Sequence, residues 1–199
     1  MPWDITMTLN NKRFPSPESL DNLPEDIREV ILGVQEKAGF VPNVFLMLAR
    51  RPAEFRAFFA YHDALMERES DTLSKAEKEM IVVATSARNH CLYCVVAHGA
   101  LLRIYSKNPL VADQVAINHR TAPISERHRV MLDFAFHLAL EQGEMNDDWE
   151  ARLAEVGFTT EDMWDIGAIA AFFGMSNRMV NLTGTPPNEE FYLMGRVPR

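Results

Sequence analysis

Three segments of this chain begin in the same way, and their shared opening predicts long helices. Each has an apolar residue, then a hydroxyl side chain that can cap a helix, then a polar first turn and an apolar-rich run. The three capping residues are Ser74, Ser125 and Thr159. Glu77 follows Ser74 by three residues, as a capping box requires. The openings are compatible with a repeated helical unit, although any well-capped helix starts like this.

The remaining segments also favour helices. Residues 24–39 place apolar side chains at helical spacing and end at a glycine, a common helix stop. Residues 52–69 begin with a proline at a typical first helical position. No strand-like run stands between clear turn signals. The sequence therefore predicts an all-α fold of packed helices.

The chain has 199 residues, enough for one domain with a substantial core. No linker interrupts residues 20–182, which we expect to form a single helical domain. Residues 1–19 would then be an N-terminal extension. Residues 183–199 are rich in proline and glycine and predict a C-terminal arm, packed on its own domain or on another subunit.

Composition narrows the class of protein. Hydrophobic residues make up 47% and charged residues 24%, which is typical of a globular protein. No apolar run approaches the roughly 20 residues of a membrane helix, and the N-terminus lacks the apolar core of a secretory signal. The formal charge of −8 argues against a nucleic-acid partner. We expect a cytoplasmic protein with neither a membrane nor a nucleic-acid partner.

Both cysteines of the chain lie in residues 87–103. Cys91 and Cys94 are three residues apart, so on a helix they share a face and can approach disulfide distance. His98 follows Cys94 by four residues on that face and could serve as a base. With Asn89 as N-cap, Cys91 would occupy the first turn of a new helix, where the dipole lowers a thiol pKa. One helix would carry both thiols and the base.

An acidic partner lies further upstream. Glu79 precedes Cys91 by 12 residues, or roughly 18 Å along a straight helix, too far for contact. A turn at residues 88–90 would let two helices pack together and bring Glu79 to His98. We expect Glu77, in contrast, to be a solvated first-turn carboxylate that the helix dipole favours.

Three other roles for the two cysteines compete with a redox pair. A zinc site built from Cys91, Cys94, His98 and Glu79 would have only three close ligands, whereas structural zinc sites usually add a second ligand pair. Covalent haem attachment needs histidine directly after the second cysteine, where Val95 stands. Two inert core cysteines are the remaining alternative. We favour the redox pair, with no bound metal or cofactor.

Other polar side chains receive no catalytic role from the sequence. Asn177 interrupts an apolar run, where we expect capping or subunit-interface contacts rather than a place in a pocket. Four histidines lie in ordinary helical or loop contexts: His62, His119, His128 and His137.

The spacing of the cysteine stretch resembles the signature of the alkylhydroperoxidase D-like (AhpD-like) family, within the carboxymuconolactone decarboxylase superfamily. The pattern is Glu79, eleven residues, Cys91-Leu92-Tyr93-Cys94, three residues, then His98. The flanking segments "GFVPNVFLMLARRP" and "NHRTAPISERHR" resemble the longer, peroxidase-related branch. The resemblance covers residues 20–195.

The resemblance implies an antioxidant enzyme that reduces hydroperoxides through a Cys91–Cys94 dithiol/disulfide cycle. Glu79 and His98 would move protons through a water, Cys94 would attack the peroxide, and Cys91 would resolve the sulfenic acid. An external thiol or a lipoyl group, free or on a donor protein, would supply the electrons. The resemblance also implies an AhpD-like helical fold that assembles into homo-oligomers, usually trimers or hexamers.

The chain departs from the best-known branch at one position. A histidine precedes the second cysteine there, whereas this chain has Tyr93, a poor base near neutral pH. His90 could partly substitute, or could simply be a polar residue at a helix start. Two other functions stay open: a carboxymuconolactone decarboxylase-like non-redox enzyme, and a redox-sensing stress-response protein with a switching disulfide.

Overall fold

The computed structural model describes residues 14–141 and 148–196, and all regular elements in these ranges are helical. This confirms the all-α prediction. The α-helices are α1 (Glu25–Ala38), α2 (Asn43–Ala49), α3 (Pro52–Met66), α4 (Lys75–Arg88), α5 (Leu92–Ser106), α6 (Val111–Asn118), α7 (Glu126–Phe136), α8 (Asp148–Glu155), α9 (Thr160–Thr183) and α10 (Glu190–Leu193). A 3₁₀ turn, η2 (Leu20–Asn22), precedes α1, and a π-helical turn, η3 (His137–Glu141), extends α7.

The three predicted helix starts are confirmed. The hydroxyls of Ser74, Ser125 and Thr159 each accept a hydrogen bond from a backbone N–H in the first turn of α4, α7 and α9. At Ser74 the capping box with Glu77 is complete. The expectation that Glu77 is solvated is wrong: its side chain is buried, and Arg127 Nε donates to its carboxylate at 2.9 Å. Packing of α7 against α4 removes this carboxylate from water and supplies its counter-charge.

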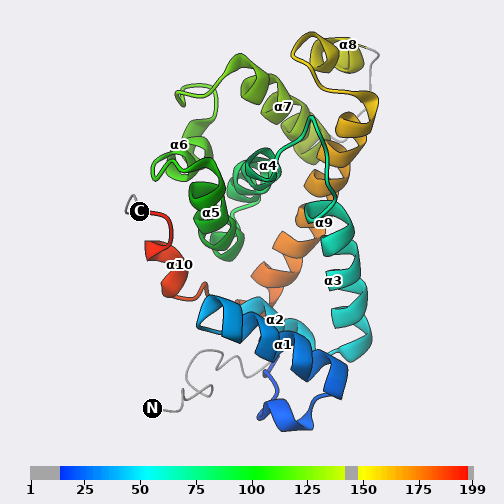
Figure 1. Ribbon diagram of the computed structural model, residues 1–199, viewed down its shortest axis with the longest axis vertical. Helices are drawn as coiled ribbons and strands as arrows, with labels where there is room; N and C mark the ends of the chain where they lie inside the picture. The colour runs from blue at the N-terminus through cyan, green and yellow to red at the C-terminus, as the bar shows by residue number, and fades with distance from the viewer. Residues whose placement is uncertain (1–13, 142–147, 197–199) are drawn as a thin grey trace.

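Helix α4 is the centre of the fold. It packs against α5, α6, α7 and α9, which surround it in Figure 1. Ile81, Val82 and Val83 are fully buried although they are consecutive and therefore face different directions. A helix that is apolar all round needs neighbours on every side, so the run "MIVVA" fixes α4 as the core helix.

A second apolar cluster lies where α1, α2 and α3 meet the start of α5. It contains Ile31, Phe55, Cys91 and Cys94, and it adjoins the main core through Phe58. The cysteines therefore lie in an apolar environment.

The turn predicted between Glu79 and the cysteines is present. Helix α4 ends at Arg88, and His90 adopts a left-handed conformation with φ of 53° that reverses the chain. The prediction that Asn89 caps the next helix is wrong. The Asn89 N–H bonds back to Thr85, so Asn89 closes α4, and Cys91 itself is the N-cap of α5. His90 alone completes the reversal of the chain. Cys91 is therefore the first residue after the turn, and its side chain caps α5.

The segment after α9 is attached to its own chain. Arg103 of α5 donates to the carbonyls of Phe191 and Met194, at 2.8 and 2.9 Å. Asn188 accepts from the Asn43 N–H at 2.8 Å. The helix α10 therefore covers the face of α5 next to the cysteines.

Candidate functional site

The two thiols meet at the start of α5. Their sulfur atoms are 2.9 Å apart, which is hydrogen-bonding contact between two free thiols rather than a disulfide of about 2.05 Å. Cys91 has 0% and Cys94 2% of its surface exposed. A small closing movement would form the disulfide without rearranging the helix.

The two thiols differ in acidity. The two thiols share a hydrogen bond, in which the neutral Cys91 thiol donates to Cys94 Sγ, and Cys91 Sγ accepts from the Cys94 backbone N–H at 3.4 Å. Once Cys91 loses its proton, its sulfur can only accept, and the Cys94 thiol becomes the donor. The bond from the Cys94 thiol is the main cause that lowers the pKa of Cys91 to about 7, while burial acts in the opposite direction. Donation to Cys91, together with burial, raises the pKa of Cys94. Deprotonation of the pair therefore begins at Cys91.

A buried amide from α9 joins this pair. Asn177 is fully buried, donates to Ser86 Oγ at 2.9 Å and accepts from Asn89 Nδ2 at 2.9 Å. Its amide also lies close enough to the cysteines to lower the pKa of both thiols, although less than the contact between the thiols changes them. The expectation of capping or interface contacts for Asn177 is wrong. The only signal in the sequence was a polar amide inside an apolar run, and only the packing of α9 on the α4–α5 turn shows what it contacts.

Glu79 and His98 form a buried ion pair across the α4–α5 hairpin. Glu79 Oε2 lies 2.7 Å from His98 Nδ1, and the two side chains are 6% and 14% exposed. Phe173 packs edge-on against the His98 ring at 4.7 Å between centroids. A positive charge on His98 lowers the pKa of Cys91, which links the ion pair to the thiols electrostatically.

The ion pair has its own opening toward the surface. Glu79 lines a small pocket of about 60 Å³, together with His62, Leu101 and Tyr105. Lys75 and Glu67, paired at 2.6 Å, also line it. A space of this size can hold water, and Glu79 is one of the few polar groups that such a water could contact there.

Tyr93 and His90, which the sequence analysis considered as supporting residues, have surroundings different from those of the Glu79–His98 pair. The Tyr93 hydroxyl accepts from the Val44 N–H at 3.3 Å, and its ring contacts Phe191. Burial raises the pKa of Tyr93, so this phenol stays protonated at neutral pH and ties α5 to α2. The side chain of His90 is exposed in the turn.

The difference in thiol acidity gives a prediction. Cys94→Ser keeps a hydroxyl that can donate to Cys91, and we expect its Cys91 pKa to stay near 7. Cys94→Ala removes the donor, so the pKa should rise toward the ordinary value of about 8.5. The check is the rate of Cys91 alkylation by iodoacetamide against pH, which follows the thiolate fraction and should shift to higher pH in the alanine variant. Superimposable profiles would contradict the assigned hydrogen bond.

The part of the chain that the structure describes offers neither a cluster of metal ligands nor a membrane-spanning helix. Within residues 14–141 and 148–196, no three His, Cys, Asp or Glu side chains are grouped so that they could hold a metal ion. None of the helices in the same ranges combines the length and the apolar character needed to cross a bilayer.

Comparisons with known proteins agree with this fold. The model of the carboxymuconolactone decarboxylase family matches residues 52–117. A peroxidase-related protein from Ralstonia eutropha JMP134, described as an alkylhydroperoxidase AhpD core, is 64% identical, with 94% of this chain and 97% of that chain covered and a TM-score of 0.91. A peroxidase-related protein from Silicibacter sp. TM1040 is 38% identical over 96% of this chain and 100% of that chain, with a TM-score of 0.87.

A more distant structure shares the fold alone. The debrominase Bmp8, in complex with 2,3,4-tribromopyrrole, is 19% identical over 92% of this chain and 95% of that chain, with a TM-score of 0.72. A search of curated proteins found no match. The high identity to the Ralstonia protein over nearly the full length, together with the matched family model, shows that the chain belongs to the AhpD-like family of the carboxymuconolactone decarboxylase superfamily.

Proposed function

We propose that the protein is a thiol-dependent peroxidase that reduces hydroperoxides. The observation that carries the proposal is the contact of an acidic thiol, Cys91, with Cys94 at 2.9 Å. The buried pair of Glu79 and His98 adds a proton relay beside it. The peroxidase-related proteins that this chain resembles over nearly its whole length support the same chemistry.

The proposed cycle has three steps. The Cys91 thiolate attacks the outer oxygen of the hydroperoxide, the O–O bond breaks, and the alkoxide leaves as an alcohol after it takes a proton that Glu79 and His98 deliver through a water. The Cys94 thiol then attacks the sulfenic sulfur, the disulfide forms, and water leaves. An external dithiol, such as a lipoyl group, reduces the disulfide and is itself oxidised by two electrons.

This order of attack is the reverse of the one that the resemblance implies. Cys91 is the N-cap of α5, where its sulfur accepts from the Cys94 backbone N–H, and the hydrogen bond between the two thiols lowers the pKa of Cys91 while it raises that of Cys94. At neutral pH the thiolate is therefore carried mainly by Cys91, and the thiolate is the nucleophile. We also propose that the chain assembles into a homo-oligomer, as the resemblance implies.

The test is peroxide consumption with several electron donors. We expect many equivalents of hydroperoxide to be consumed per chain with dithiothreitol or dihydrolipoamide, and two thiols to be lost when the donor is withheld. A redox sensor would consume one equivalent and stop. A decarboxylase-like enzyme would consume none, and either result would contradict the proposal.

A further inference from the structure

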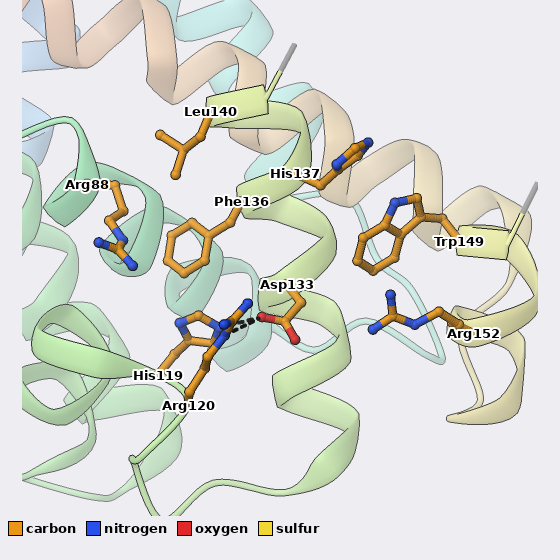
Figure 2. A pocket seen from close by; sticks show the side chains of 9 residues that line it. All are labelled: Arg88, His119, Arg120, Asp133, Phe136, His137, Leu140, Trp149 and Arg152. Carbon is orange, nitrogen blue, oxygen red and sulfur yellow. Dashed lines mark hydrogen bonds and ion pairs between the residues drawn. The ribbon is translucent and has the colours of Figure 1, made fainter. Parts of the chain in front are cut away.

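A second pocket, separate from the thiols and the Glu79–His98 pair, lies between α4, α7 and α8 (Figure 2). Its volume is about 350 Å³, within the size range of small-molecule sites. Arg88 from the end of α4 and Arg152 from α8 reach into it from opposite sides of Asp133 in Figure 2. Neither the cysteines nor Glu79 contributes to its walls.

The charge of this pocket is opposite to that of the chain. Its walls carry three arginines, the third being Arg120, against the single carboxylate of Asp133. The whole chain has a formal charge of −8. A local excess of positive charge on an acidic protein attracts an anion to that place and to few others.

The one carboxylate in the pocket is already neutralised. His119 Nε2 lies 2.8 Å from Asp133 Oδ1, and Arg120 Nε donates to the same oxygen at 3.3 Å. His119 is only 3% exposed, and its ring packs on Phe136 at 4.5 Å. Asp133 therefore holds His119 and Arg120 in place at the bottom of the pocket. Because its charge is compensated, it repels an incoming anion only weakly.

The guanidinium groups of the other two arginines, Arg88 and Arg152, are available to a ligand. Among the described residues, neither Arg88 nor Arg152 forms an ion pair with an acidic side chain. Their guanidinium carbons lie instead 5.3 Å from the Phe136 ring and 4.1 Å from the Trp149 ring. Stacking on an aromatic ring orients a guanidinium without using up its hydrogen-bond donors for a carboxylate.

We propose that this pocket binds a small organic anion with two carboxylates on a flat apolar body. Arg88 and Arg152 would each take one carboxylate, because a guanidinium presents paired donors that match its two oxygens. Phe136, Trp149 and Leu140 would contact the apolar body between them. The proposal stands on these contacts alone and does not depend on peroxidase activity.

The test uses terephthalate as the probe, measured by titration calorimetry on the full chain. We expect saturable binding of terephthalate, weaker binding of benzoate, which has one carboxylate, and none of the uncharged terephthalamide. Arg88→Gln and Arg152→Gln should each weaken terephthalate binding by about tenfold, as loss of a charge-assisted bidentate contact does. Arg28→Gln on α1, outside the pocket, is the matched control and should bind like the unmodified chain.

Three results would overturn the proposal. The first is absence of saturable terephthalate binding, or unchanged affinity in the Arg88→Gln/Arg152→Gln double variant. The second is binding of inorganic phosphate as tight as that of terephthalate, which would mean that the aromatic walls contribute nothing. The third is a changed sedimentation mass in the double variant, which would make this face a contact between copies of the chain. Circular dichroism and thiol titration show whether each variant is folded.

Discussion

Replacing either cysteine by serine should reduce hydroperoxide turnover to background, a loss of about 10³-fold or more, as is usual when a covalent nucleophile is removed. Cys91→Ser removes the acidic thiol, and Cys94→Ser removes the thiol that closes the disulfide. Both variants should fold, since serine fills nearly the same space and can keep the hydrogen bond between the two side chains. Steady-state peroxide consumption with dithiothreitol measures the loss. Full activity in either variant would rule out a two-cysteine cycle.

The same two variants show which of the two cysteines attacks the peroxide. With one equivalent of peroxide and dimedone as a sulfenic-acid trap, Cys94→Ser should give a stoichiometric adduct on Cys91, because the sulfenic acid formed there persists without its resolving partner. Cys91→Ser should give little adduct, since Cys94 loses its proton less readily. The opposite pattern would restore Cys94 as the attacking sulfur.

The second large effect on turnover is expected when the Glu79–His98 pair loses its carboxylate. Glu79→Gln keeps the shape of the side chain and a hydrogen bond to His98 but removes the carboxylate that exchanges a proton. We expect kcat to fall by about 10²- to 10⁴-fold, the usual range for a lost acid–base group. The number of free thiols per chain should still be two, since the contact between Cys91 and Cys94 does not involve Glu79.

Glu77→Gln is the matched control for this change. Glu77 lies on the same helix, but its carboxylate closes the α4 cap and binds Arg127. Its replacement should lower the free energy of unfolding by about 1–3 kcal/mol, because the partly buried Arg127 guanidinium loses its counter-charge. Turnover by the folded fraction should be unaffected. Normal kcat in Glu79→Gln, or a kcat loss in Glu77→Gln as large as that expected for Glu79→Gln, would contradict the assigned relay.

Local signals in the sequence predicted much of the fold. Helix starts depend on a side chain and an N–H only three residues away, so Ser74, Ser125 and Thr159 could be identified before the structure was known. The Glu79–His98 contact could also be predicted, since it needs only one turn between two helices. The cap of α5 was assigned two residues too early because the sequence does not show which residue takes the left-handed conformation.

The sequence by itself determined the helical class, the cysteine pair with Glu79 and His98 near it, and the family. These depend on hydrogen bonds and spacings within short stretches of chain. Only the tertiary structure decided that Asn177 lies beside the thiols, that Glu77 is buried, and that Arg88 and Arg152 line one pocket. Each of these depends on how distant helices pack, and packing is set by the shapes of many side chains at once rather than by any pattern along the chain.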